Sequence, residues 1–246
     1  MPLAGRVALV TGGARGIGRA IVDAFAEAGC SGVTLDTDVS DDELPSGFVA
    51  QGGDVTHEDD IRTAVTRAVD THGHLDIVVA NAGLVPPWRE TEHIDLDEWD
   101  RAFAINVRGV VATIKQAVPA MRNAGGSVIV LGSLNSRRAH PRQCLYTATK
   151  HAVLGIVRST ALDLGRYGIR VNAIGPGPIA TDALLERIEK RAGEGEPSVD
   201  DVLAGFDDDA ALGRIATVDD VASTAVFLAG TGAAGITGQI IPVDGG

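Results

Sequence analysis

The chain has 246 residues, with 21 lysines and arginines against 33 aspartates and glutamates, so its formal net charge is −12. A hydrophobic fraction of 45% and a charged fraction of 22% are those of a folded globular protein, which excludes a mainly disordered chain. The acidic excess argues against nucleic acid or an anionic membrane as a partner. Two cysteines are too few for a disulfide framework, the histidines lack metal-ligand spacing, and no apolar run reaches the length of a membrane span. We therefore expect a cytoplasmic protein without a signal peptide or a metal site.

Short apolar runs alternate with longer helix-like segments along the chain. Apolar residues at helical spacing predict helices at 19–28, 61–69, 96–121, 143–167 and 218–228. The apolar runs predict strands at 7–10, 33–35, 48–50, 75–80, 127–131, 169–174 and 239–243. Most of these runs are apolar throughout, which is typical of a parallel sheet covered by helices on both faces. Residues 181–214 are rich in Glu, Asp and Gly, and we expect them to be a substrate-loop insertion in one domain spanning 1–246.

A glycine-rich turn, TGGARGIG at 11–18, joins the first predicted strand to the first predicted helix. Glycines at such a turn let backbone N–H groups approach a pyrophosphate at the N-terminus of the helix. Asp36 ends the second strand eighteen residues after Gly18, where a carboxylate can accept a hydrogen bond from an adenosine ribose. Each feature alone also fits an ordinary turn. Together they favour a dinucleotide site.

A second group of polar residues follows the fifth predicted strand. Tyr146 and Lys150 are four residues apart, so they share one face of the predicted helix, and Ser133 ends the strand before it. A tyrosine with its ordinary pKa of about 10 is a poor base at neutral pH, and a neighbouring cation favours the phenolate. The pair alone also fits an exposed helix face without function. Its position after Ser133 favours a catalytic site.

The glycine spacing, Gly-x3-Gly-x-Gly, resembles that of the classical short-chain dehydrogenase/reductase family. Other motifs of that family follow in the same order: Asp54-Val55, Asn81-Ala82-Gly83, Asn106, Ser133, Tyr146-x3-Lys150 and PGPIAT at 176–181. The resemblance covers residues 6–246. It implies a doubly wound Rossmann-type α/β domain with a seven-stranded parallel sheet in the order 3-2-1-4-5-6-7. It also implies a homotetramer built on the helices at 96–121 and 143–167.

The resemblance assigns roles to four catalytic residues. Tyr146 is the expected general base in oxidation and general acid in reduction. Lys150 is expected to lower the pKa of Tyr146 and to hold the nicotinamide ribose. Ser133 is expected to hydrogen-bond the substrate oxygen, and we favour it over Ser136, which lies past the strand end. Asn106 is expected to kink the long helix and to hold a water near Lys150.

The resemblance also predicts which residues bind the cofactor. Asp54 is expected to accept a hydrogen bond from the adenine amino group, residues 81–83 to floor the adenosine, and Ile179 and Thr181 to hold the carboxamide. The whole expected set lies at strand ends, in the glycine-rich turn and on the catalytic helix: Gly12, Arg15, Gly16, Ile17, Gly18, Asp36, Asp54, Val55, Asn81, Ala82, Gly83, Tyr146, Lys150, Pro176, Gly177, Ile179 and Thr181.

NAD is the predicted cofactor. The Asp36 carboxylate accepts from the ribose 2′-hydroxyl of NAD and repels the 2′-phosphate of NADP. Arg15 opposes this preference, but Thr37 and Asp38 rather than an arginine follow Asp36. We expect the reaction to interconvert a secondary alcohol and its ketone, with a small polyol, sugar or hydroxy acid as substrate.

The walls of the substrate pocket are expected from Asn135, Gln143, residues 86–88 and the segment after Thr181. The amides of Asn135 and Gln143 favour a polar substrate. The basic residues of 137–142 either attract a carboxylate or phosphate, or are solvated or face another subunit. Two other functions stay open: NADPH-dependent reduction of 3-oxoacyl thioesters, and dinucleotide binding without catalysis.

Overall fold

A parallel sheet forms the centre of the computed structural model, which describes all residues except 39–43 and 194–196. In the described residues the sheet has seven strands in the order β3-β2-β1-β4-β5-β6-β7, and all neighbouring strands are parallel. This confirms the predicted order. The strands are β1 (Val7–Thr11), β2 (Ser31–Asp36), β3 (Phe48–Gly52), β4 (Ile77–Ala80), β5 (Gly126–Leu131), β6 (Ile169–Pro176) and β7 (Ile240–Val243).

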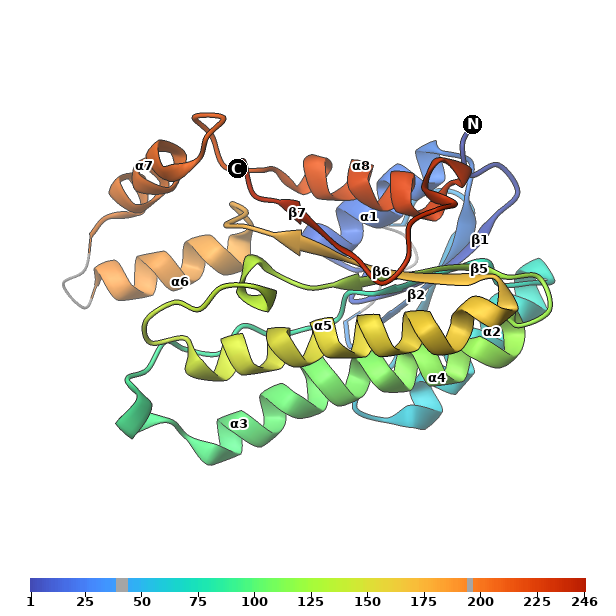
Figure 1. Ribbon diagram of the computed structural model, residues 1–246, viewed down its shortest axis with the longest axis horizontal. Coiled ribbons are helices and arrows are strands. Elements are labelled where there is room, and N and C mark those ends of the chain that lie inside the picture. Colours follow the sequence, from blue (N-terminus) through green and yellow to red (C-terminus); the bar gives the residue numbers. More distant parts are fainter. Residues whose placement is uncertain (39–43, 194–196) are drawn as a thin grey trace.

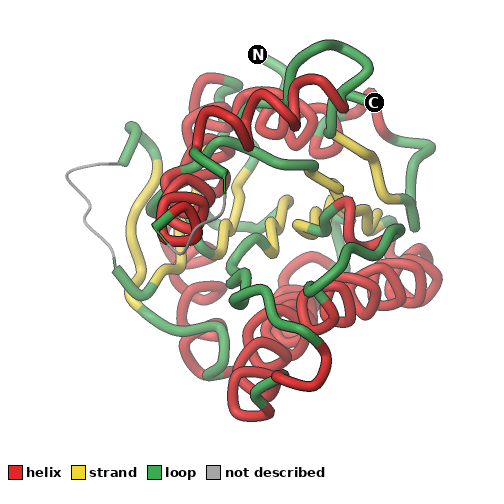
Figure 2. The backbone as a smooth tube through the Cα atoms, turned by 90° about the vertical axis from the view of Figure 1, so that its left-hand side faces the viewer, coloured by secondary structure: helices red, strands yellow, loops and turns green. Residues whose placement is uncertain are grey.

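Helices cover both faces of the sheet (Figures 1 and 2). The helices are α1 (Gly16–Glu27), α2 (Glu58–His72), α3 (Leu96–Phe103), α4 (Gly109–Met121), α5 (Cys144–Leu164), α6 (Asp182–Ala192), α7 (Val199–Asp209) and α8 (Val218–Ala229). Helices α1 and α8 pack on one face, and α2, α4 and α5 pack on the other. Within the described ranges, no helix has the length and apolar character needed to cross a membrane.

The continuous apolar strands are explained by burial on both faces. Successive side chains of a strand point to opposite faces, so Val7 and Leu9 of β1 join the core under α2, α4 and α5. Ala8 and Val10 join the core under α1 and α8. Every residue of β1 is buried, which is why the strand shows no alternation of apolar and polar residues.

The predicted helix over 96–121 is interrupted in the structure. A π-helical turn at Ala104–Arg108 separates α3 from α4, and Asn106 lies buried in its middle. The Asn106 side chain bonds to the backbone of Leu84, which lies in the loop after β4: its Oδ1 accepts from the Leu84 N–H and its Nδ2 donates to the Leu84 carbonyl, both at 2.8 Å. This tertiary contact accompanies the interruption at the position where the family resemblance places a kink.

Two helices form where the weak periodicity of 181–214 predicts none. Helix α6 follows β6 after a short loop, α7 comes next, and both lie beyond the carboxyl end of β6 (Figure 1). None of the α7 side chains is fully buried, so the helix lacks the strong apolar face by which sequence periodicity is read. Local capping instead supports it, because the Ser198 hydroxyl accepts from the Asp201 N–H at 3.2 Å.

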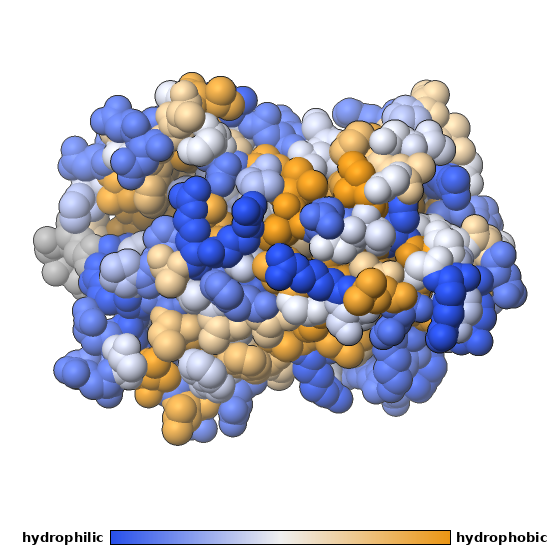
Figure 3. All heavy atoms as spheres, in the orientation of Figure 1, coloured by the Kyte–Doolittle hydropathy of each residue, from blue (hydrophilic) through white to orange (hydrophobic). Residues whose placement is uncertain are grey.

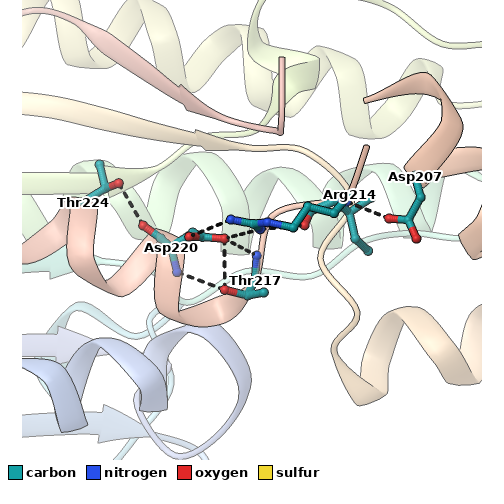
Figure 4. Close-up of polar contacts among 6 residues, drawn as sticks. Asp207, Arg214, Thr217, Asp220 and Thr224 are labelled. Carbon is teal, nitrogen blue, oxygen red and sulfur yellow. Dashed lines mark hydrogen bonds and ion pairs between the residues drawn. The ribbon is translucent and has the colours of Figure 1, made fainter. Parts of the chain in front are cut away.

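A polar cluster joins α7 to α8 (Figure 4). The Asp207 carboxylate accepts from the Ile215 N–H at 2.7 Å, and Arg214 donates to Asp220 at 2.8 Å. Thr217 and Asp220 cap α8 reciprocally, since each side chain accepts from the other residue's N–H. The hydrogen bond from Arg214, followed by those from Thr217, lowers the pKa of Asp220 from 3.8 to about 2. The segment after α7 is thereby fixed to the start of α8.

Candidate active site

The glycine-rich turn after β1 forms a cradle that side chains cannot enter. Gly12 and Gly16 have positive φ angles of 68° and 56°, which favour glycine. A Cβ at Gly18 would overlap the carbonyl oxygen of Gly12. Helix α1 begins at Gly16 with no side-chain cap from Arg15 and no acidic residue in its first turn. Its first N–H groups are therefore open to an anion such as a pyrophosphate.

Asn81 braces this cradle from the end of β4. Its Nδ2 donates to the carbonyls of Thr11 at 3.0 Å and Gly12 at 2.8 Å. The Thr11 hydroxyl accepts in turn from the N–H groups of Asn81 and Ala82, both at 3.1 Å. The Asn81 amide therefore holds the turn, and the expected contact of residues 81–83 with the adenosine stays a prediction.

Two carboxylates lie at the ends of neighbouring strands. Asp36 at the end of β2 accepts from the Ala14 N–H at 3.0 Å and the Thr37 N–H at 2.8 Å, so its carboxylate lies beside the glycine-rich turn. Asp54, after β3, accepts from the Thr56 N–H at 2.8 Å. Arg15 is exposed at the rim of the same turn.

The cradle and both carboxylates lie at the carboxyl edge of the sheet, where the strand order reverses between β1 and β4. Such a switch point is the usual ligand crevice of an open α/β sheet. The crevice offers open N–H donors for a pyrophosphate, a carboxylate for a ribose and a turn that admits no side chain. The residues present fit a dinucleotide.

Lys150 of α5 is held under the same edge of the sheet. Its Nζ donates to the Leu131 carbonyl at 2.7 Å and lies 5.7 Å from the centroid of the Tyr146 ring. The side chain is buried, and this burial lowers the pKa of Lys150 to about 8. The Lys150 ammonium is thus fixed at the end of β5, and Lys150 lies one helical turn after Tyr146 in α5.

The pKa of the Tyr146 phenol is set by opposing influences. Burial raises its pKa, whereas a side-chain hydrogen bond with Ser133 and the charge of Arg187 lower it. The charge of Arg187 of α6 therefore acts on the phenol, and the part that the resemblance assigns to Lys150 stays a prediction. No motif marks Arg187, which belongs to the acidic segment of weak periodicity. The sequence shows only that Arg187 and Arg191 are four residues apart, so they share one face of a helix.

Ser133 is positioned by a short 3₁₀ turn at Leu134–Ser136. The Ser133 hydroxyl accepts from the Asn135 N–H at 3.1 Å, and Ser136 Oγ accepts from the Ser133 N–H at 3.2 Å. Ser136 therefore supports Ser133. The Asn135 Nδ2 donates to Gln143 at 2.8 Å and to Thr147 at 3.0 Å, so the structure leaves no Asn135 amide N–H for a substrate, whereas the expectation that its oxygen accepts from one stays a prediction. Both amide protons are used inside the protein.

Asn106 links the loop after β4 to the catalytic helix. Besides its two bonds to Leu84, its Nδ2 donates to Thr149 at 3.3 Å. Thr149 lies next to Lys150 and donates to the Tyr146 carbonyl at 2.8 Å. Asn106 thus joins two segments of the site while remaining buried itself.

A pocket opens beside Tyr146 between the loop after β4 and the start of α5. Residues 86–88 and Gln143 line it, as predicted, together with parts of 94–98 and 142–146. The Trp88 ring lies between two guanidinium groups, with the Arg191 carbon 4.1 Å and the Arg142 carbon 6.0 Å from the ring centroid. Arg142 has a φ of 60°, so the segment before α5 makes a tight, unusual turn here. The loop after β4 and the segment before α5 therefore meet at this pocket, and Arg191 of α6 lies against its Trp88. Asn135 and the described residues after Thr181, which were also expected to line it, are not among its lining residues.

The fold agrees with comparisons to known proteins. The sequence profile of the family described as "Enoyl-(Acyl carrier protein) reductase" matches residues 12–246. Curated relatives include (+)-borneol dehydrogenase 2 of Salvia officinalis, 40% identical over 99% of this chain and 89% of the relative. L-Fucose dehydrogenase of Mus musculus is 38% identical over 98% of this chain and 88% of the relative. The chain belongs to the classical short-chain dehydrogenase/reductase family.

Solved structures agree as well. A 3-ketoacyl-(acyl-carrier-protein) reductase from Brucella melitensis, complexed with NADH, has a TM-score of 0.88 and 30% identity, covering 99% of this chain and 98% of that one. Carveol dehydrogenase from Mycobacterium avium, in complex with NAD, has a TM-score of 0.90 and 29% identity, covering 100% of this chain and 98% of that one. Both complexes contain the type of cofactor that the sequence predicts.

Proposed function

We propose that the protein is an NAD-dependent oxidoreductase that interconverts a secondary alcohol and its ketone. One observation carries the proposal: the half-buried Tyr146 side chain, bonded to Ser133 and near Lys150, lines a pocket at the same sheet edge as the glycine cradle. A titratable group in a desolvated cleft next to a dinucleotide-shaped crevice is the arrangement that alcohol oxidation requires. The borneol and fucose dehydrogenases among the relatives support this reaction class.

In this proposal the chain's own residues bind and orient the substrate and the cofactor, and they transfer a proton. Tyr146 takes the hydroxyl proton in oxidation and returns it in reduction, since its side chain lines the pocket. The Ser133 hydroxyl faces the substrate oxygen, since the 3₁₀ turn fixes its position. Lys150, fixed on Leu131, holds the nicotinamide ribose, and Asn106 keeps the catalytic helix in register with the loop after β4.

NAD, when bound, supplies the group that accepts or gives the hydride. The glycine cradle would hold its pyrophosphate, Asp36 its adenosine ribose, and Asp54 with Val55 its adenine. The NADH and NAD complexes of related structures support this cofactor. The preference for NAD over NADP rests on the Asp36 carboxylate beside the glycine-rich turn, with Arg15 exposed at the rim.

One alternative function, the reduction of 3-oxoacyl thioesters, stays open because of a specific observation. The predicted preference for NAD argues against this alternative if the reduction of 3-oxoacyl thioesters requires NADPH. The Brucella melitensis 3-ketoacyl reductase is complexed with NADH, however, so the cofactor does not separate the two functions. The two functions differ in their substrates, so an assay of both substrate classes distinguishes them.

A screen of NAD reduction across polyols, aldoses, hydroxy acids and aliphatic or cyclic alcohols tests the proposal. The same protein is assayed with NADH and NADPH on a 3-oxoacyl thioester. We expect NAD reduction with at least one secondary alcohol. Activity confined to the thioester would establish the alternative, and NADH binding without turnover on any compound would establish a non-catalytic dinucleotide-binding protein.

We also propose a cytoplasmic homotetramer that forms through α4 and α5. Apolar side chains gather over these two helices in Figure 3, and the exposed fractions of Val111 and Leu162 are 43% and 85%. An apolar helix face of this kind is typical of an interface between subunits. The reducing cytoplasm would keep Cys30 and Cys144 as free thiols.

A further inference from the structure

Gln143 forms part of the pocket wall next to Tyr146. It is the N-cap residue of α5, and Tyr146 is the third residue of the helix, so the two are neighbours on its first turn. Both residues line the pocket. The Gln143 side chain is half-buried and makes no capping hydrogen bond to α5. Its amide is therefore available for another contact close to the phenol.

The oxygen of the Gln143 amide is already bonded inside the protein. Asn135 Nδ2 donates to Gln143 Oε1 at 2.8 Å, and the same nitrogen donates to Thr147 Oγ1 at 3.0 Å. Asn135 is only 6% exposed and is not among the residues that line the pocket. With both of its N–H groups in use, the Asn135 amide has a fixed orientation. It therefore holds the Gln143 oxygen on the side away from a ligand.

The nitrogen of the same amide is available to a ligand. Within the described residues, no group accepts a hydrogen bond from Gln143 Nε2, and this atom is not one of the buried polar atoms left without a partner. An amide nitrogen that is neither bonded nor fully buried is accessible at the pocket wall. It carries two N–H donors and accepts nothing. At Gln143 the pocket therefore offers hydrogen-bond donors.

The Gln143 amide is also close to the serine that is expected to bind the reacting oxygen. The Ser133 hydroxyl accepts from the backbone N–H of Asn135 at 3.1 Å, and the Asn135 side chain donates to Gln143. One residue thus connects Ser133 to the Gln143 amide. A ligand whose carbinol oxygen contacts Ser133 and Tyr146 consequently places its neighbouring atoms toward Gln143.

We propose that the substrate is a secondary alcohol with a hydrogen-bond-accepting oxygen on the carbon next to the carbinol, and that Gln143 Nε2 donates to this oxygen. Hydroxyl, ether and carbonyl oxygens all qualify as acceptors, whereas a purely hydrocarbon neighbour does not. Gln143 is then a specificity-determining residue. Asn135 is a positioning residue, because it turns the donor side of the Gln143 amide toward the ligand. The inference rests on the proposed alcohol oxidation and names its substrate class.

The experiment compares tetrahydropyran-3-ol with cyclohexanol as substrates for NAD reduction. The two rings have the same size, and in the first an ether oxygen is attached to the carbon next to the carbinol. The ratio of their kcat/KM values is measured for each protein, so the inductive effect of the oxygen cancels between proteins. We expect Gln143→Leu to lower this ratio by about three- to tenfold relative to wild type, the value of one neutral hydrogen bond.

Asn135→Asp tests the orientation of the amide. The new carboxylate accepts hydrogen bonds but cannot donate to Gln143 Oε1, so the Gln143 amide turns its nitrogen away from the ligand. We expect the ratio to fall as far as in Gln143→Leu, and the double variant to show no further fall, because Asn135 acts through Gln143. A merely structural role of Asn135 would lower both rates alike and leave the ratio unchanged.

Gln239→Leu is the matched control, because it makes the same change at an exposed position outside the pocket lining. It keeps the wild-type ratio. The two single variants are independent, so if one does not fold the other decides. A wild-type ratio in Gln143→Leu or in Asn135→Asp overturns the inference. A wild type that oxidises only alcohols without such an oxygen also overturns it and leaves the proposed function intact. Failure of wild type on every alcohol and ketone breaks the proposed function itself.

Discussion

Tyr146 combines two opposing influences at one oxygen atom. Burial raises the pKa of the phenol, while Ser133 and Arg187 lower it. The phenolate is the base for oxidation, so a raised pKa means that the active form accumulates as pH increases. The neutral phenol is the acid for reduction, so the opposite dependence holds in that direction.

We therefore expect kcat/KM for alcohol oxidation to rise with pH above neutrality, and kcat/KM for ketone reduction to fall over the same range. Arg187→Met shifts both profiles to higher pH, because it removes a cation that lowers the pKa of Tyr146. Steady-state rates from about pH 6 to 10, measured with an uncharged substrate, check this. Profiles that are flat in both directions would contradict the role of Tyr146.

Asp36 is the residue on which the predicted preference for NAD over NADP depends. We expect a higher kcat/KM with NAD than with NADP, and Asp36→Ala narrows the gap because the carboxylate no longer repels the 2′-phosphate. The control is Asp38→Ala, which removes an exposed carboxylate two residues further along the chain. A wild type that prefers NADP would overturn the assignment.

Residue types at motif positions were enough to predict a set of candidate residues that the structure brings to one sheet edge, and their catalytic and cofactor roles stay predictions. The use of both Asn135 amide N–H groups inside the protein could not be predicted, because their hydrogen bonds to Gln143 and Thr147 depend on the path of the loop. Arg187 could not be found from a motif, because its electrostatic effect on the Tyr146 phenol arises only in the folded chain.

At the scale of elements, the start of α8 is held by its cap and by the Arg214–Asp220 ion pair. The pKa of Asp220 is 3.8 in the unfolded chain and about 2 in the folded one. A lowered folded pKa contributes stability that is fully present above the unfolded pKa and is lost as pH falls towards the folded pKa.

Asp220→Asn should therefore lower the free energy of unfolding by about 1 kcal/mol near neutral pH, a value reduced by the exposure of the pair. The difference from wild type shrinks as pH falls from 3.8 towards 2. Thermal unfolding of both proteins at pH 6 and pH 3 measures it. A difference that is the same at both pH values would show that the carboxylate charge has no part in the cap.

Elements with strong apolar patterns were predictable, and those that depend on tertiary contact were not. The strands of the sheet follow continuous apolar runs, and their burial on both faces explains why. The π-helical turn at Ala104–Arg108 coincides with the bonds between Asn106 and Leu84, which no helical periodicity reveals. Helix α7 buries too little to leave a periodic signal.

For the whole molecule, the family resemblance predicted the strand order, and the parallel sheet places every candidate site residue at its carboxyl edge. Assembly is a prediction at this scale. Light scattering should give four times the chain mass of 25.3 kDa, and Val111→Asp on α4 should reduce it by charging an apolar interface. Leu212→Asp, on an exposed turn outside these helices, is the control. A wild-type monomer at micromolar concentration would rule out the assembly.

The central claim, that the Tyr146 oxygen transfers the proton of the reaction, is tested most directly by Tyr146→Phe. The substitution removes one oxygen atom and keeps the ring that packs at the start of α5. We measure kcat on a substrate from the NAD-reduction screen and the affinity for NADH by fluorescence. The account predicts that turnover is abolished while NADH affinity stays within about twofold of wild type. A variant that keeps more than about a tenth of the wild-type kcat would contradict the mechanism proposed for this site.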